Sequence, residues 1–141
     1  MKPDKRLSNR GGNVKLMQNN KNAINWFEIP VRNLGKAASF YGSVLGQPLT
    51  QTAFGGIPHA MFAVTGDHPV TGALIEDPKR EPGASGVTIY LDVAAVQPAV
   101  DRALEAGGKL VQPFTDLGVH GTSALIADHD GNVVGLHAAK A

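Results

Sequence analysis

The stretch from Phe27 to Gly46, FEIPVRNLGKAASFYGSVLG, decides the fold, because its pattern returns 62 residues later in the same order. At that shift Val31 to Leu34 aligns with Val93 to Val96, and Leu45-Gly46 aligns with Gly107-Gly108. Each copy has an apolar segment with strand character, followed by a segment of helical spacing that ends at glycine. Such a repeat indicates two copies of one structural module.

The first copy predicts a strand, a helix and three more strands. Ala23 to Val31 is rich in β-branched and aromatic residues, which favours a strand. Asn33 is a suitable cap for the helix that follows, and Gly46 can adopt the left-handed conformation that ends it. The three later strands are expected at Pro48 to Phe54, Ala60 to Val64 and Val70 to Glu76.

The second copy repeats this βαβββ order. Its first strand is expected at Val87 to Val93, its helix from about Ala95 to Ala106, and its later strands at Lys109 to Gln112, Thr122 to Ala127 and Asn132 to Ala138. Either copy alone would leave an open sheet with an uncovered apolar face. The predicted fold class is therefore α+β, with two βαβββ modules that pack or pair into a curved, barrel-like mixed sheet around a cleft.

Charge divides the chain into a basic start and a mildly acidic remainder. Residues 1–22 have a net charge of +5, whereas residues 23–141 have a net charge of −4. We predict a flexible basic N-terminal extension at 1–22, followed by a single domain at 23–141. Within that domain, module 1 covers about 23–76, an exposed linker covers 77–86, and module 2 covers about 87–138.

Composition excludes several classes of function. The chain has no cysteine, so disulfide scaffolds, iron–sulfur clusters and cysteine nucleophiles are excluded. The acidic remainder offers no basic surface for nucleic acid, and no apolar stretch is long enough to span a membrane. We expect a cytoplasmic protein that binds neither nucleic acid nor membrane.

Three stretches together resemble the vicinal oxygen chelate superfamily, which includes glyoxalases, bleomycin-resistance proteins and extradiol dioxygenases. They are FEIPVRNLGKAASFYGSVLG, GVTIYLDVAAVQPAVDRALEAGGKLVQPFTDLGVHG and LIADHDGNVVGLH. Metal-dependent members hold an ion with four His or Glu ligands, and the resemblance places those positions at Trp26, Ala73, Thr88 and Gly135. None of these four is a His or an acid. We therefore predict a cleft without metal or other cofactor.

Strand alternation indicates which side chains face the cleft. Trp26 and Glu28 share one face, Thr88, Tyr90 and Asp92 share the corresponding face of the second module, and Gly135 and His137 do so on the last strand. Glu28 is interpreted as a general base, as a ligand anchor, or as an acid paired with Arg32 or placed at the sheet's rim. Trp26 is interpreted as a stacking surface or as a core residue. The expected ligand-binding residues are Trp26, Glu28, Phe62, Thr88, Tyr90, His120 and His137.

Two functions remain open at this stage. The first is binding of a small organic molecule without turnover, in a homodimer, with Trp26 and Glu28 suited to a flat cation. The alternative is an enzyme related to lyases and isomerases that acts next to a carbonyl, with Glu28 as base and His137 or Tyr90 as acid. A variant of the alternative places a nonstandard metal between Glu28 and His137, with His59 or His120 as a third ligand.

Overall fold

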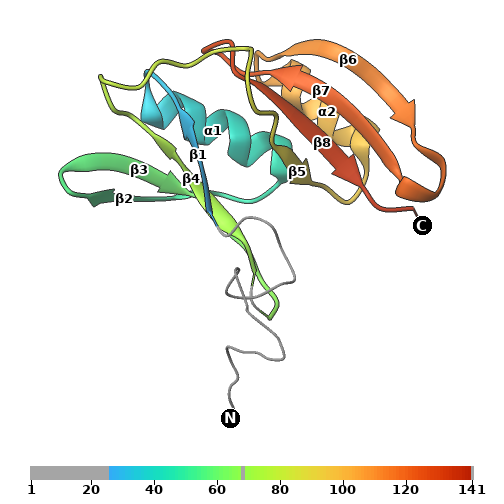
Figure 1. The fold of residues 1–141 in the computed structure, drawn as a ribbon, viewed down its shortest axis with the longest axis horizontal. Helices are drawn as coiled ribbons and strands as arrows, with labels where there is room; N and C mark the ends of the chain where they lie inside the picture. Colours follow the sequence, from blue (N-terminus) through green and yellow to red (C-terminus); the bar gives the residue numbers. More distant parts are fainter. Residues whose placement is uncertain (1–25, 68, 141) are drawn as a thin grey trace, which may run out of the picture.

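Two βαβββ modules follow one another along the chain in the computed structural model, which describes residues 26–67 and 69–140 (Figure 1). The predicted extension at 1–22 lies outside these residues. Module 1 contains β1 (Trp26–Pro30), α1 (Leu34–Leu45), β2 (Thr50–Phe54), β3 (Ile57–Met61) and β4 (Thr71–Ile75). Module 2 contains β5 (Tyr90–Asp92), α2 (Val96–Glu105), β6 (Lys109–Asp116), the short 3₁₀ helix η1 (Gly118–His120), β7 (Thr122–Ala127) and β8 (Val133–Ala138).

Each module forms a mixed four-stranded sheet, with strand orders β1-β4-β3-β2 and β5-β8-β7-β6. The parallel strand pairs β1·β4 and β5·β8 occupy equivalent places in the two sheets. Glu28 is paired with Ala73 in the first, and Tyr90 is paired with Gly135 at the equivalent position of the second. These two pairs are related by the same shift of 62 residues that relates the sequence copies. The repeat and the α+β fold class are therefore confirmed, and the modules pack as separate sheets.

Several element boundaries differ from the sequence prediction. The strand expected at Ala60 to Val64 begins at Ile57, because the Gly55-Gly56 turn closes the hairpin directly between Phe54 and Ile57. Strand β6 continues to Asp116 through two irregularities of register. The first strand of module 2 is limited to Tyr90–Asp92.

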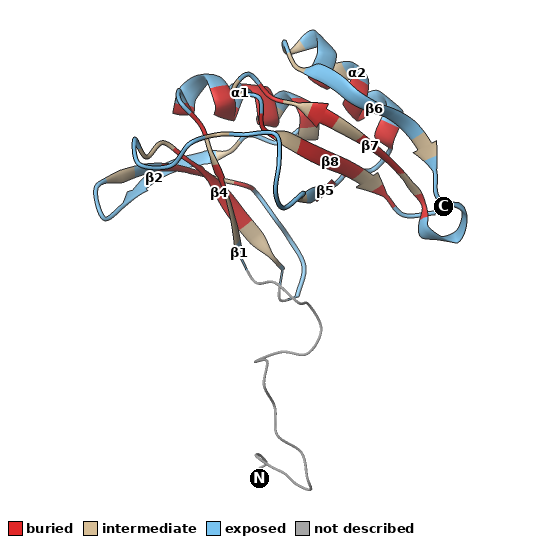
Figure 2. Cartoon of the chain, turned by 45° about the horizontal axis from the view of Figure 1, so that its top comes forward, coloured by how far each residue is buried: buried red, intermediate tan, exposed pale blue. Residues whose placement is uncertain are grey.

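The core lies between the two helices and the sheet faces turned toward them. Helix α1 packs against β3 and β4, α2 packs against β6, β7 and β8, and the helices pack against each other. Figure 2 shows buried residues along β4, β7, β8 and the inner helix faces, whereas β2 and most of β6 are exposed. The predicted cap is confirmed, because Asn33 Oδ1 accepts from the backbone N–H of Lys36. Gly46 ends α1 with a φ of 70°.

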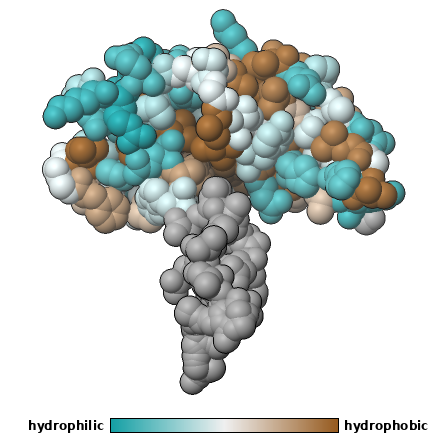
Figure 3. All heavy atoms as spheres, viewed as in Figure 1, coloured by the Kyte–Doolittle hydropathy of each residue, from teal (hydrophilic) through white to brown (hydrophobic). Residues whose placement is uncertain are grey.

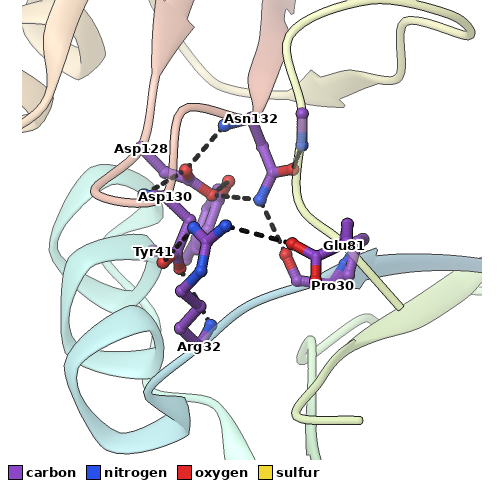
Figure 4. A network of polar contacts seen from close by, with 8 residues as sticks. Pro30, Arg32, Tyr41, Glu81, Asp128, Asp130 and Asn132 are labelled. Carbon is purple, nitrogen blue, oxygen red and sulfur yellow. Dashed lines mark hydrogen bonds and ion pairs between the residues drawn. The ribbon is translucent and has the colours of Figure 1, made fainter. Parts of the chain in front are cut away.

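A buried polar network joins the modules (Figure 4). Asp128, in the turn between β7 and β8, is 7% exposed and accepts a 2.8 Å hydrogen bond from the hydroxyl of Tyr41 on α1. The side chain of Asn132 donates to the same carboxylate and, at 2.8 Å, to the carbonyl oxygen of Pro30 at the end of β1. Its own amide oxygen accepts from Gly83 in the linker. One turn of module 2 therefore fixes a helix, a strand end and the linker.

Replacing Tyr41 by Phe tests this network. The change removes a donor from the buried Asp128 carboxylate, so we expect the free energy of unfolding to fall by about 1–3 kcal/mol in urea titrations. Burial, and then the charge of Asp128, raises the pKa of Tyr41 well above 10.0. The unfolded chain therefore loses this proton more easily, and wild-type stability should fall as the pH rises above about 10, an effect absent from Tyr41→Phe.

The matched control is Tyr90→Phe, because Tyr90 is half exposed and none of the described residues hydrogen-bonds its hydroxyl. We expect this variant to change the free energy of unfolding by less than about 0.5 kcal/mol. Equal effects of the two substitutions would show that the hydroxyl of Tyr41 does not stabilise the contact between the modules.

Candidate functional site

An apolar cavity lies between the two modules. Its volume is about 640 Å³, and residues from β1, β4 and β5, from the end of α1 and from the segments beside these strands line it. Aliphatic and aromatic residues predominate in the lining, which consists of Phe27, Leu45, Phe62, Ala63, Val64, Thr65, Pro69, Val70, Thr71, Ile89, Tyr90, Leu91 and Asp92. Figure 3 shows apolar residues at the surface between the two modules. This size and lining are typical of pockets for small organic molecules.

Phe62 forms the aromatic wall on the module 1 side. It follows β3 directly and is 7% exposed. Its ring lies 5.4 Å from that of Phe27 and 5.7 Å from that of Tyr41. Because both neighbours are themselves packed in or against the core, the ring of Phe62 is fixed in place.

Tyr90 forms the corresponding wall on the module 2 side. Its ring lies over Gly135 of β8, so closely that a Cβ at position 135 would clash with Tyr90 Cδ1. A glycine at position 135 therefore allows this placement of the ring. Tyr90 is 54% exposed, so much of the ring remains available for contact.

The carboxylate of Glu28 accepts hydrogen bonds from one side chain on β1 and one in the linker. Arg80 Nη1 donates to Glu28 Oε1 at 2.7 Å, and Trp26 Nε1 donates to Glu28 Oε2 at 3.1 Å. These two hydrogen bonds, that of Arg80 first, hold the pKa of Glu28 below its ordinary 4.5. The carboxylate is therefore ionised at neutral pH and its charge is balanced by Arg80.

His137 lies in the other sheet. Its Nε2 is 2.7 Å from the carbonyl oxygen of His120, the last residue of η1. A carbonyl oxygen only accepts, so Nε2 carries the proton in this hydrogen bond. The backbone of His137 is opposite Asp92 of β5 and Ser123 of β7. Glu28 and His137, expected as an acid–base pair, thus have separate partners in separate sheets.

The four positions implied for metal ligands carry no suitable donors. Trp26 uses its indole N–H toward Glu28, Ala73 is fully buried, Thr88 precedes β5, and Gly135 lies under the Tyr90 ring. Within residues 26–67 and 69–140 there is no group of three His, Asp or Glu side chains placed to hold an ion. These residues do not fit the divalent site of metal-dependent relatives.

The structure thus places the expected ligand residues in three groups. Phe62 and Tyr90 both line the cavity. Trp26 is hydrogen-bonded to Glu28 on β1, and the ring of His137 contacts the backbone carbonyl of His120 at the end of η1. Thr88 is exposed beside β5. Sequence reasoning missed the role of Arg80, which is 52 residues from Glu28 and leaves no local signal. It placed Asp92 on the same face as Tyr90 but gave it no role, although Asp92 lines the cavity.

Comparison with known proteins agrees with this geometry. The profile of the Glyoxalase/Bleomycin resistance protein/Dioxygenase superfamily matches residues 23–136. The antibiotic binding protein TnmS3 from Streptomyces sp. CB03234 is 25% identical, with a TM-score of 0.63 over 84% of this chain and 97% of that one. The hypothetical protein SA1046 from S. aureus is also 25% identical, with a TM-score of 0.58 over 82% of this chain and 93% of that one.

A curated relative, "Putative glyoxylase CFP32" of Mycobacterium bovis, is 28% identical over 116 residues, which are 79% of this chain. The match covers 44% of the relative, so the chain spans less than half the length of that protein. No helix among the described residues is long and apolar enough to cross a membrane.

The ion pair on β1 yields a prediction about Glu28. In Arg80→Gln the strongest donor to the carboxylate loses its charge, so the pKa of Glu28 should rise toward 4.5 in an NMR titration of the side-chain carboxyl. Because a lowered pKa stabilises the folded state above pH 4.5, wild type should lose this contribution as the pH falls. Both side chains are partly exposed, so the loss should be at most about 1 kcal/mol.

Lys79→Gln removes the same charge from the neighbouring exposed position and should leave the pKa of Glu28 in place. An unchanged pKa in Arg80→Gln, or an equal rise in both variants, would contradict the assignment of Arg80 as the partner of Glu28.

Proposed function

The chain belongs to the glyoxalase/bleomycin resistance protein/dioxygenase superfamily, and from this premise we propose that it binds a small organic molecule between its modules without turning it over. The observation that carries the proposal is the 640 Å³ cavity, whose walls include the rings of Phe27, Phe62 and Tyr90. Flat apolar molecules gain affinity from burial against such rings. TnmS3, which has this fold, is described as an antibiotic binding protein.

Binding without turnover is preferred over catalysis because of the state of Glu28. A general base works best when its pKa lies near the operating pH. Arg80 and Trp26 hold the pKa of Glu28 below its ordinary value, which makes the carboxylate a weak base. Both of its oxygens already accept hydrogen bonds, so a substrate proton would have to displace one of these donors.

We extend the proposal to a metal-free site in a homodimer. The absence of His and acids at the four positions implied for metal ligands supports the metal-free site. Exposed apolar side chains support the homodimer. On the edge strand β6, Leu110, Val111 and Phe114 are between 44% and 50% exposed. Such side chains are commonly covered by a partner when they gather on one surface.

Sedimentation velocity tests the proposed homodimer. We expect a species of twice the 14.7 kDa chain mass, and Phe114→Ser on β6 should shift it toward the monomer because a large apolar contact is lost. Leu104→Ser removes a similarly exposed side chain from α2 and should leave the dimer intact. A wild-type monomer at micromolar concentration would rule out the homodimer.

Thermal unfolding with 2-naphthylmethanol tests ligand binding. This neutral bicyclic probe should raise the melting temperature of wild type by several degrees at saturating concentration, since a ligand at about 100 times its dissociation constant adds about 2.7 kcal/mol. Ala63→Phe fills the cavity from an exposed lining position and should remove the shift. Chromatography should recover the probe unchanged.

Ala53→Phe is the matched control, because it adds the same bulk to an exposed position of β2 outside the lining of this cavity. It should keep the wild-type shift. A wild-type protein that shows no shift, or an Ala63→Phe variant that keeps it, would refute binding in the cavity between the modules.

A further inference from the structure

One charged side chain stands out in the cavity lining. Among the described residues that line the cavity, Asp92 is the only acid, and none is a Lys, Arg or His. The other polar side chains of the lining are the hydroxyl-bearing residues Thr65, Thr71 and Tyr90. A ligand in this cavity therefore meets one carboxylate beside apolar walls.

None of the described residues balances the charge of Asp92. Every ion pair found among residues 26–67 and 69–140 involves other acids: Glu28 with Arg80, and Glu81 and Asp130 with Arg32. Glu28, which sequence reasoning favoured as the anchor for a cation, thus has a cation of its own. Asp92 lacks such a partner within the same part of the chain.

Asp92 shares its side of the strand with an aromatic ring. Tyr90 and Asp92 are two residues apart on β5, so their side chains point to the same face of the sheet. The ring of Tyr90 is fixed over Gly135, and both residues are exposed. An aromatic face and a carboxylate together attract organic cations, by cation–π and charge interactions.

We propose that the ligand is an organic cation, a protonated amine on an apolar ring system, with its amine at Asp92 and Tyr90 and its rings against the wall formed by Phe62 and Phe27. This inference rests on the proposed binding function and adds the chemical class of the ligand. The apolar walls supply most of the affinity, while Asp92 selects for positive charge. Asp92 is thus the residue that determines specificity at this site.

Three probes with one ring system test the charge preference by isothermal titration calorimetry. They are 2-naphthylmethylamine, which is cationic, 2-naphthylmethanol, which is neutral, and 2-naphthoate, which is anionic. Wild type should bind the amine about five- to tenfold more tightly than the alcohol, and the carboxylate more weakly than either, because the anchor is a partly exposed charge. The preference should shrink in high salt, which screens such charges.

In Asp92→Asn the amine and the alcohol should bind equally, with the affinity for the alcohol unchanged. Asp101→Asn removes the same charge from the exposed face of α2, outside the cavity lining, and should keep the wild-type order. If the alcohol binds and the amine binds no better, or if Asp92→Asn keeps the preference, the assignment of Asp92 is overturned and the binding function stands. If none of the three probes binds, both proposals fail.

Discussion

The buried carboxylate of Asp128 is the constraint on which the arrangement of the modules depends. A charge at this depth is costly unless hydrogen bonds surround it, and Asp128 obtains them from Tyr41, from the side chain and backbone of Asn132, and from the backbone of Asp130. Only Tyr41 belongs to the other module. The geometry that satisfies Asp128 is therefore also the geometry that fixes module 2 against α1.

The position of this network explains where the cavity lies. Asn132 holds the Pro30 end of β1, whereas the cavity is lined by Phe27 near the other end of that strand and by Tyr90 to Asp92 of β5. The sheets are thus joined at one end of β1 and remain unpaired at the other. A space between two unpaired strand edges can hold a ligand without any change in the hydrogen bonding of either sheet, so the core and the binding site do not compete for the same contacts.

The sequence predicted the fold well, because the repeat contains local signals. Helix α1 was expected between Asn33 and Gly46 from its helical spacing and from these two capping residues, and both act as expected. The shift of 62 residues found in the sequence also relates two observed pairs of the structure, Glu28 opposite Ala73 and Tyr90 opposite Gly135. The candidate site was less predictable, since the partners of its charges come from distant segments. The linker brings Arg80 to Glu28 through tertiary structure that periodicity does not record.

The replacement of chelating residues and the apolar character of the cavity are connected through Tyr90 and Gly135. A glutamate at position 135 would bring its Cβ into a clash with the Tyr90 ring, so a metal-binding side chain at this position and this aromatic wall exclude each other. With the ring in place, affinity must come from burial. At about 25 cal/mol per Å², covering 200–300 Å² of apolar ligand surface gives roughly 5–8 kcal/mol before the costs of association. A single exposed carboxylate beside an aromatic ring adds only about 1.0–1.4 kcal/mol. Burial therefore decides whether a molecule binds, and charge decides which of several similar molecules binds best.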